Sequence, residues 1–361
     1  MAEVGERMDY LKSAPYRRML QSLIDSFPYW EKIQGKSLLL SGASGMIGSL
    51  LIDVLMIQNE GMDPSKQYRI FAASRSESAA KQRFYHWMKH PAFSYFPHDI
   101  TQPLDQFPEA PDLLIHAAST THPAQYTQEP INTILSNILG TQNMLDVSAR
   151  HPGTRFLLLS SVEVYGENRG DADYFDEGYC GYINCNTLRA GYPESKRVSE
   201  AMCQAYIQEK GVDAVIIRLP RCYGPTMRMS DTKALSQFIK KGLAEEDIVL
   251  KSAGNQFYSY AFVCDAVLGM LYVLTSGVCG EAYDLADRQS DITLKELASL
   301  VARTAGRKVV FESPSESEKA GYSTATRAVM RGEKLKQLGW APRYDMESGI
   351  KLTMEMLKDG I

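Results

Sequence analysis

Residues 38–48 read Leu-Leu-Leu-Ser-Gly-Ala-Ser-Gly-Met-Ile-Gly. An apolar strand, a glycine-rich turn and the start of a helix follow one another here, and in this setting the glycine pattern indicates dinucleotide binding. Gly42 permits the tight turn, Gly45 lets the backbone approach a pyrophosphate, and Gly48 lets the helix pack closely on the strand. The N-terminus of the helix adds its partial positive charge, which favours phosphate binding. The alternative interpretation is an ordinary glycine-rich turn. We predict cofactor contacts from Gly42, Ser44, Gly45, Met46, Ile47 and Gly48.

A second pattern, Tyr192-Pro-Glu-Ser-Lys196, places a phenol and an ammonium one helical turn apart. Tyrosine titrates at about 10 in water and needs a nearby cation to act as a base at neutral pH. Lys196 supplies that cation and would also bind the nicotinamide ribose, so Tyr192 and Lys196 are cofactor contacts as well. Ser161, at the end of a Ser-Ser strand, is the candidate that orients the substrate oxygen. Together these residues predict hydride chemistry on an alcohol or ketone.

Apolar strands alternate with helices through the first two thirds of the chain, which predicts an α/β fold with a Rossmann-type, doubly wound parallel sheet. Strands are expected at 37–41, 68–73, 94–96, 112–117, 155–160 and 214–219, and helices at 48–58, 131–149, 190–209 and 346–357. We divide the chain into an N-terminal helical extension (1–35), an NAD(P)-binding domain (36–224, with a return segment at about 258–288) and a smaller C-terminal substrate-binding lobe (mainly 225–361).

The N-terminal extension carries apolar residues at helical spacing between residues 11 and 27, including Leu20, Leu23, Ile24 and Phe27. This spacing predicts an additional packed helix. The sequence leaves open whether that helix covers the core of its own chain or a partner subunit.

The composition excludes several classes of protein. The 361 residues are 44% hydrophobic and 23% charged, with a net charge of -4, which is typical of a soluble globular protein without a face for nucleic acid. No membrane span or signal peptide is apparent, so we expect a cytoplasmic protein. The six cysteines lack metal-ligand spacing, so we expect reduced thiols and no metal site.

The end of the second strand bears on the choice of cofactor. An acid usually holds the ribose 2′-hydroxyl of NAD here, but this chain has Ser74 followed by Arg75. A serine and a guanidinium suit a 2′-phosphate, which favours NADP(H), although Arg75 stacked on the adenine or solvated is nearly as well supported. Asp99 and Ile100 are expected beside the adenine, with a plain loop aspartate as the alternative.

Beyond these patterns, the chain resembles the extended short-chain dehydrogenase/reductase family of nucleotide-sugar epimerases, dehydratases and decarboxylases, and within it the UDP-glucuronate decarboxylases. The resemblance covers residues 36 to about 355. It is carried by His-Asp-Ile-Thr-Gln-Pro-Leu (98–104), His-Ala-Ala-Ser (116–119) with Pro123, Tyr126 and Pro130, the loop and helix at 177–192, Tyr-Gly-Pro-Thr-Met-Arg-Met-Ser-Asp (223–231) and Leu-Gly-Trp-Ala-Pro (338–342).

The resemblance implies roles for individual residues. Ser161, Tyr192 and Lys196 would form the catalytic triad, and Glu163 would be a further acid/base beside the sugar. A carboxylate that caps a neighbouring loop is the alternative for Glu163. Further cofactor contacts would come from Ala117, Ala118 and Ser119. Substrate contacts would come from Tyr126, Glu163, Arg189, Arg221, Tyr258 and Arg327.

Departures from the family pattern cluster around the substrate. The 4,6-dehydratases carry an Asp where this chain has Val162, which disfavours dehydration. Tyr258 stands where the decarboxylases carry an Arg, and Arg221 stands where they carry an Asn. The Arg221 guanidinium either supplies the displaced cation or selects another nucleotide or sugar. Arg327 aligns with a diphosphate-binding Arg.

Three functions follow as hypotheses. The first is a nucleotide-sugar enzyme that oxidises C4 through Tyr192 and NAD(P), then decarboxylates or epimerises and returns the hydride. The second is a net NADPH-dependent reductase of a nucleotide-linked sugar or polyol precursor, favoured by Arg75 and the altered Arg221 and Tyr258 positions and disfavoured by Glu163. The third is a non-catalytic NAD(P)-binding sensor, against which the intact triad argues.

The helices expected at 131–149 and 190–209 match those that pair across a dimer interface in the family. We therefore expect a homodimer. The apolar residues Ile134, Ile138, Met144 and Leu145 serve equally well as intramolecular core.

Overall fold

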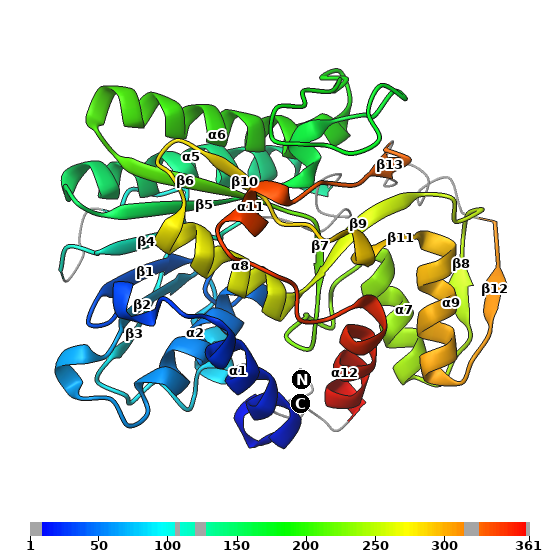
Figure 1. Cartoon of the computed structure of the whole chain (residues 1–361), viewed down its shortest axis with the longest axis horizontal. Helices are drawn as coiled ribbons and strands as arrows, with labels where there is room; N and C mark the ends of the chain where they lie inside the picture. Colours follow the sequence, from blue (N-terminus) through cyan, green and yellow to red (C-terminus); the bar gives the residue numbers. More distant parts are fainter. Residues whose placement is uncertain (1–8, 105–108, 120–127, 314–324, 359–361) are drawn as a thin grey trace.

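The computed structural model describes residues 9–104, 109–119, 128–313 and 325–358. Its largest sheet has seven strands, all parallel, in the order β10-β6-β5-β4-β1-β2-β3 (Figure 1). This confirms the predicted α/β fold class. The strands are β1 (Ser37–Ser41), β2 (Arg69–Ser74), β3 (Phe93–Pro97), β4 (Leu113–His116), β5 (Arg155–Ser161), β6 (Asp213–Leu219) and β10 (Ala282–Asp284).

Helices cover both faces of this sheet. On β1, Leu38 and Leu40 are buried on the face of α2 (Met46–Asn59) and α8 (Val263–Ser276), while Leu39 is buried on the opposite face. There α5 (Pro130–Arg150) and α6 (Gly191–Lys210) pack side by side. A strand that is apolar at every position therefore fits the sheet, since both of its faces meet a helix.

A second lobe lies beside the carboxyl end of the large sheet (Figure 1). Its main sheet contains β7, β9, β11 and β13, and β8 pairs with β12. The strands are β7 (Arg221–Tyr223), β8 (Ile248–Leu250), β9 (Phe257–Phe262), β11 (Asp291–Thr293), β12 (Val309–Phe311) and β13 (Arg327–Ala328). The helices of this lobe are α7 (Ala234–Leu243), α9 (Leu294–Ala305) and α12 (Met346–Lys358), whereas α11 (Glu333–Gln337) packs on α8 and β10 of the large sheet.

The chain crosses between the two sheets more than once. β7 and β9 belong to the second lobe, whereas α8 and β10 return to the large sheet. Consequently, segments that are far apart in the sequence meet at the carboxyl ends of β4 and β5. The predicted catalytic residues lie there.

The N-terminal extension packs on its own chain. A 3-10 turn at Tyr10–Lys12 precedes α1 (Ala14–Ser26), which starts later than the spacing predicted because Ser13 caps it and Pro15 occupies its first turn. α1 contacts α2, α8 and α12. The sequence had left open whether this helix covers its own core, and the structure places Leu20 and Leu23 there.

Asp53 of α2 fastens this extension. Tyr16 Oη donates to Asp53 Oδ2 at 2.7 Å, Trp87 Nε1 donates to Oδ1 at 2.9 Å, and Arg83 at the end of α3 (Glu77–Arg83) pairs with the same carboxylate. Among the described helices, none combines the length and apolar character that a membrane crossing requires.

Candidate active site

The glycine turn joins β1 to α2 with a backbone that only glycine accommodates well. Gly42 has a φ of 72°, and a Cβ there would lie 2.6 Å from the carbonyl carbon of Ala117. A Cβ at Gly48 would lie 2.7 Å from the Gly42 oxygen. Backbone therefore packs directly against backbone at both positions, and the turn leads straight into the N-terminus of α2. This arrangement fits a dinucleotide pyrophosphate.

Two residues after β7 reach this turn, and the sequence did not single them out. Arg228 Nη2 donates to the backbone oxygen of Ser44 at 3.2 Å and to its Oγ at 3.3 Å. Thr226 Oγ1 donates to the Met46 oxygen at 2.9 Å. The second lobe thus contacts the predicted pyrophosphate site, and only the closeness of these residues to Tyr-Gly-Pro (223–225) could have indicated this.

At the other end of the predicted cofactor site, Ser74 ends β2. Its backbone oxygen accepts from Tyr95 Oη at 2.8 Å, and its hydroxyl lies 3.3 Å from the same atom. Hydrogen bonds from Thr101 hold the pKa of Asp99 below its ordinary value, with smaller contributions from Arg75 and His98. Ser74, Arg75 and Asp99 are therefore brought together, and Tyr95 joins them as a residue that the sequence did not indicate.

Tyr192 is buried at the start of α6, next to two serine hydroxyls. Burial raises its pKa to about 12, against the opposing hydrogen bonds with Ser161 and Ser119 and the charge of Arg189. Ser119 Oγ also donates to Asn137 of α5 at 2.8 Å, and Asn137 in turn donates to Ser195 Oγ at 2.9 Å. Ser119, predicted beside the cofactor, thus contacts the phenol itself.

Lys196 lies one turn further along α6 and is also buried. Its Nζ donates to the Leu159 oxygen of β5 at 2.8 Å. Burial lowers its pKa to about 8, and the charge of Glu200 opposes this shift. His116, at the end of β4, donates or accepts at Ser41 Oγ (2.7 Å), and burial together with Lys196 lowers its pKa to about 3. His116 is therefore a neutral neighbour of the Lys196 ammonium.

Glu163 lies between two guanidiniums. Its position follows from the 3-10 turn at Val162–Tyr165, whose first residues are capped by Ser161 Oγ accepting from the Glu163 amide at 3.3 Å. Arg189 Nη2 lies 3.2 Å from Glu163 Oε2, and Arg221 Nη2 lies 3.5 Å from Oε1. Glu163, Arg189 and Arg221 therefore form one cluster with Ser161.

Arg221 and Tyr258 are in direct contact. The Arg221 Cζ lies 3.5 Å from the centre of the Tyr258 ring, and Tyr258 Oη donates to the Ala325 oxygen at 2.8 Å. β7 and β9 pair in parallel, with Arg221 beside Tyr260, which brings the two side chains to one place. Arg221 Nη1 is buried and has no hydrogen-bond partner among the described residues. The Nη1 of Arg221 can therefore donate a hydrogen bond to a ligand next to Glu163.

Arg327 lies apart from this cluster. It stands beside Phe257 on β13, donates through Nε to the Asp173 oxygen at 2.9 Å and faces the rings of Tyr174 and Phe257. Tyr126 lies outside the described residues. Over the residues that are described, no group of three or more His, Cys, Asp or Glu side chains could hold a metal ion.

A parallel seven-stranded sheet, a glycine turn after its interior strand β1 and a Tyr-Lys pair on a helix beside the strand ends define an extended short-chain dehydrogenase/reductase. The model of the NAD dependent epimerase/dehydratase family matches residues 38–286. The chain belongs to this family.

Curated relatives extend the match over nearly the whole chain. UDP-glucuronic acid decarboxylase 1 of Xenopus tropicalis is 30% identical over 354 residues, which cover 96% of this chain and 79% of that protein. UDP-glucuronic acid decarboxylase 6 of Arabidopsis thaliana is 31% identical over 324 residues, covering 88% of both.

Solved structures agree with this fold. The UDP-glucuronic acid 4-epimerase of Bacillus cereus, in complex with UDP-glucuronic acid and NAD, has a TM-score of 0.74 at 18% identity and covers 90% of this chain and 99% of its own. An epimerase of Methanothermobacter thermautotrophicus has a TM-score of 0.76 at 18% identity and covers 96% of both chains.

Proposed function

We propose that this enzyme oxidises C4 of a nucleotide-diphosphate sugar, then decarboxylates or epimerises the resulting ketone and reduces it again. The observation that carries this proposal is the cluster in which Glu163, held by Arg189 and Arg221, lies beside Ser161 near Tyr192. Simple reduction requires no second acid/base, whereas chemistry at C5 does. The relatives named UDP-glucuronic acid decarboxylase support a UDP-glucuronate-like substrate.

The residues divide the work by position. Bound NAD(P) would accept hydride from C4 and later return it. Ser161 holds the C4 oxygen, and Tyr192 takes the hydroxyl proton. The Lys196 ammonium, fixed by its hydrogen bond to the Leu159 oxygen, supplies positive charge one helical turn from Tyr192. Once C4 is a ketone, a carboxylate on C5 is a β-keto acid and loses carbon dioxide readily. The electron pair that carbon dioxide leaves at C5 takes a proton, for which Glu163 is the acid that we propose. Hydride then returns to C4, and Tyr192 gives its proton back to the C4 oxygen.

Arg221 supports recognition of an anionic sugar. Its Nη1 lacks a partner among the described residues, and its plane rests on Tyr258, so it can donate to a carboxylate without leaving Glu163. Arg221 would thus supply the positive charge that is lost where Tyr258 stands in place of the family's Arg.

The first test incubates the purified protein with UDP-glucuronate and either NAD or NADP and follows the product by mass spectrometry. Loss of carbon dioxide supports decarboxylation, and an unchanged mass with an altered sugar configuration supports epimerisation. Recovery of unchanged UDP-glucuronate under both cofactors, with dinucleotide binding intact, would contradict this substrate.

A net NADPH-dependent reductase is the second candidate, because Ser74 and Arg75 stand where an acid would repel a 2′-phosphate. The choice between NAD and NADP is tested by titrating each dinucleotide calorimetrically into wild type and Arg75→Ala. NADP selectivity predicts at least about tenfold weaker NADP binding in the variant, with NAD binding unchanged. Equal affinities in both proteins would argue that Arg75 is only solvated.

The assembly that we propose is a homodimer formed through α5 and α6. Ile131 and Leu135 of α5 and Val198 of α6 are large apolar side chains that stay exposed in the single chain, at 72%, 41% and 40%. Covering them with the same helices of a second copy would remove an apolar surface from water.

A further inference from the structure

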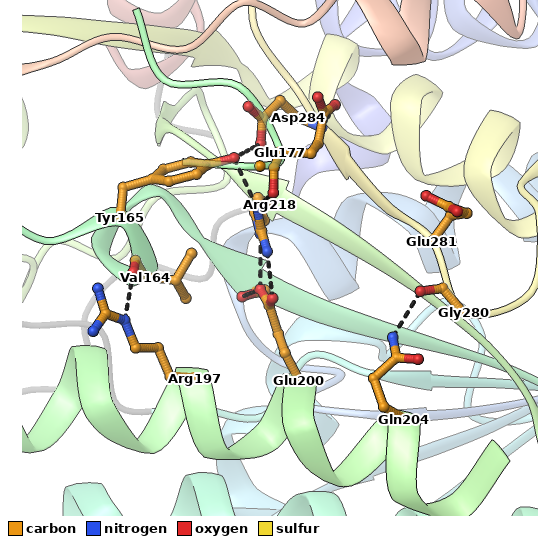
Figure 2. Close-up of polar contacts among 12 residues, drawn as sticks. Val164, Tyr165, Glu177, Arg197, Glu200, Gln204, Arg218, Gly280, Glu281 and Asp284 are labelled. Atoms are coloured by element: carbon orange, nitrogen blue, oxygen red, sulfur yellow. Dashed lines mark hydrogen bonds and ion pairs between the residues drawn. The ribbon is translucent and has the colours of Figure 1, made fainter. Parts of the chain in front are cut away.

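Arg218 of β6 is at the centre of a polar network that links α6 to the large sheet (Figure 2). Its Nε and Nη2 donate to Glu200 Oε1 and Oε2 at 3.0 and 2.7 Å, and its Nη1 donates to Tyr165 Oη at 2.9 Å. Tyr165 Oη in turn donates to Asp284 Oδ1 of β10 at 2.6 Å. The network therefore joins α6, β6, β10 and the turn that carries Glu163.

Glu200 connects this network to the reacting groups. It lies one helical turn after Lys196 on α6, and its Oε1 also accepts from the hydroxyl of Ser160, the residue before Ser161, at 2.5 Å. The side chains of Glu200 and Arg218 are each only 13% exposed, so water screens their charges weakly. A fixed carboxylate thus lies one helical turn from Lys196 and bonds the residue that precedes Ser161.

Other side chains hold the same helix in place independently of Glu200. Arg197 Nε donates to the Val164 oxygen, and Gln204 Nε2 donates to the Gly280 oxygen, each at 2.7 Å (Figure 2). These bonds hold α6 against the sheet on either side of Glu200. The position of α6 therefore does not depend on Glu200 alone, and the effect of the Glu200 charge can be examined separately.

We propose that Glu200 is a positioning residue whose carboxylate, fixed by Arg218 and Ser160, keeps the buried Lys196 in its ammonium form. Burial works against that form, because it lowers the pKa of Lys196 to about 8, and Glu200 is the first of the groups that oppose this shift. The inference rests on the proposed function only for its activity readout, since the charge state of Lys196 can be measured without turnover.

Several titratable or charged groups lie around Lys196 and Glu200 and could contribute to the same balance. They are His116 from β4, Tyr192 and Cys203 from α6 itself, Arg218 from β6, Asp284 from β10, and Glu163 and Tyr165 from the turn after β5. The face of α5 packed on this region offers the uncharged Asn137 and Thr141. His116 is neutral at physiological pH, and Arg197, the charged residue next to Lys196 in the sequence, donates to the Val164 oxygen instead. Glu200 and Arg218 pair with each other, and theirs are the fixed charges that this proposal concerns.

The experiment follows the titration of Lys196 by NMR in protein labelled with 13C at lysine Cε, with the signal assigned by Lys196→Arg. Glu200→Gln removes the anion and leaves Arg218 uncompensated, so the midpoint should fall by about 1 pH unit. Arg218→Met leaves Glu200 alone and should raise it. Glu200→Gln/Arg218→Met removes both charges, and its midpoint should lie between those of wild type and Glu200→Gln.

The double variant keeps the test decisive if Arg218→Met does not fold, because it leaves no unpaired buried charge. Gln204→Leu is the matched control that loosens α6 without changing a charge, and its midpoint should equal that of wild type. A midpoint that stays constant in Glu200→Gln, or moves equally in Gln204→Leu, overturns the proposal. Where UDP-glucuronate is turned over, the alkaline limb of kcat/KM should move with the NMR midpoint; absence of turnover would count against the proposed substrate and leave the NMR result standing.

Discussion

At the scale of single residues, burial disfavours the charged form of both members of the Tyr192–Lys196 pair. The phenol is raised to a pKa of about 12 and the ammonium is lowered to a pKa of about 8. A phenol with such a pKa is a poor base on its own, so proton transfer must be assisted by charge that arrives with the substrate complex. We therefore expect Tyr192, as the proposed base, to be active only when the dinucleotide is bound.

Replacing Tyr192 by Phe tests this directly. The variant keeps the ring in its buried site and removes only the hydroxyl, so kcat should fall by about 10²–10⁴-fold while dinucleotide affinity stays within threefold of wild type, about the margin expected of an unperturbed site. Stopped-time product assays and calorimetry measure the two quantities. Tyr182→Phe, at an exposed ring, is the control. Retained turnover in Tyr192→Phe would remove this residue from the chemistry.

Arg221 should set substrate affinity rather than dinucleotide affinity, because it stacks on Tyr258 and pairs with Glu163. Arg221→Met should raise KM for UDP-glucuronate by about 10–100-fold, the range for losing one charge-assisted contact. Arg221→Lys keeps the charge without the planar stack and should recover only part of that loss. Equal KM values for wild type and Arg221→Met would show that the free guanidinium edge does not meet the sugar.

At the scale of elements, the alternation of apolar strands and helices predicted the large sheet well, since β1 and β5 have apolar centres, are buried at nearly every position and needed helices on both faces. Boundaries shifted by one to three residues where caps decide them, as at Ser13 before α1. Two contacts of the predicted cofactor site were not predicted from the sequence: Arg228 of the second lobe meets Ser44, and Tyr95 of β3 meets Ser74. Both depend on tertiary packing, which no local sequence pattern records. The Arg221–Tyr258 contact was predictable only as a pair of departures from the family pattern.

The N-terminal extension gives a prediction at this scale. Asp53→Ala leaves Arg83 buried without its partner and should lower the free energy of unfolding by about 3–5 kcal/mol. Tyr16→Phe removes a single hydrogen bond to the same carboxylate and should cost about 1.5–3 kcal/mol. Chemical denaturation followed by tryptophan fluorescence measures both. Equal stability of Asp53→Ala and wild type would mean that the extension is not fastened by this network.

At the scale of the whole molecule, the two lobes are interleaved rather than joined by one linker. Thr226 and Arg228 of the second lobe hold the glycine turn, while α8 and β10 carry the chain back to the large sheet. Buried Asp265 of α8 accepts from the amides of Arg343 and Tyr344 just before α12. Substrate and dinucleotide would therefore be enclosed by segments that are already bound to each other, which suits chemistry that must retain an intermediate.

The exposed apolar side chains on α5 and α6 should decide the oligomeric state. Leu135→Glu and Val198→Glu each place a charge where a second copy would bury it, so either change should weaken the proposed dimer by about 100-fold or more. Sedimentation velocity over a concentration series measures the change. Phe311→Glu, an equally exposed apolar site on β12 of the other lobe, should leave the dimer unaffected. If Leu135→Glu and Val198→Glu stay dimeric while Phe311→Glu dissociates, the copies meet through the second lobe, and the apolar faces of α5 and α6 require another partner.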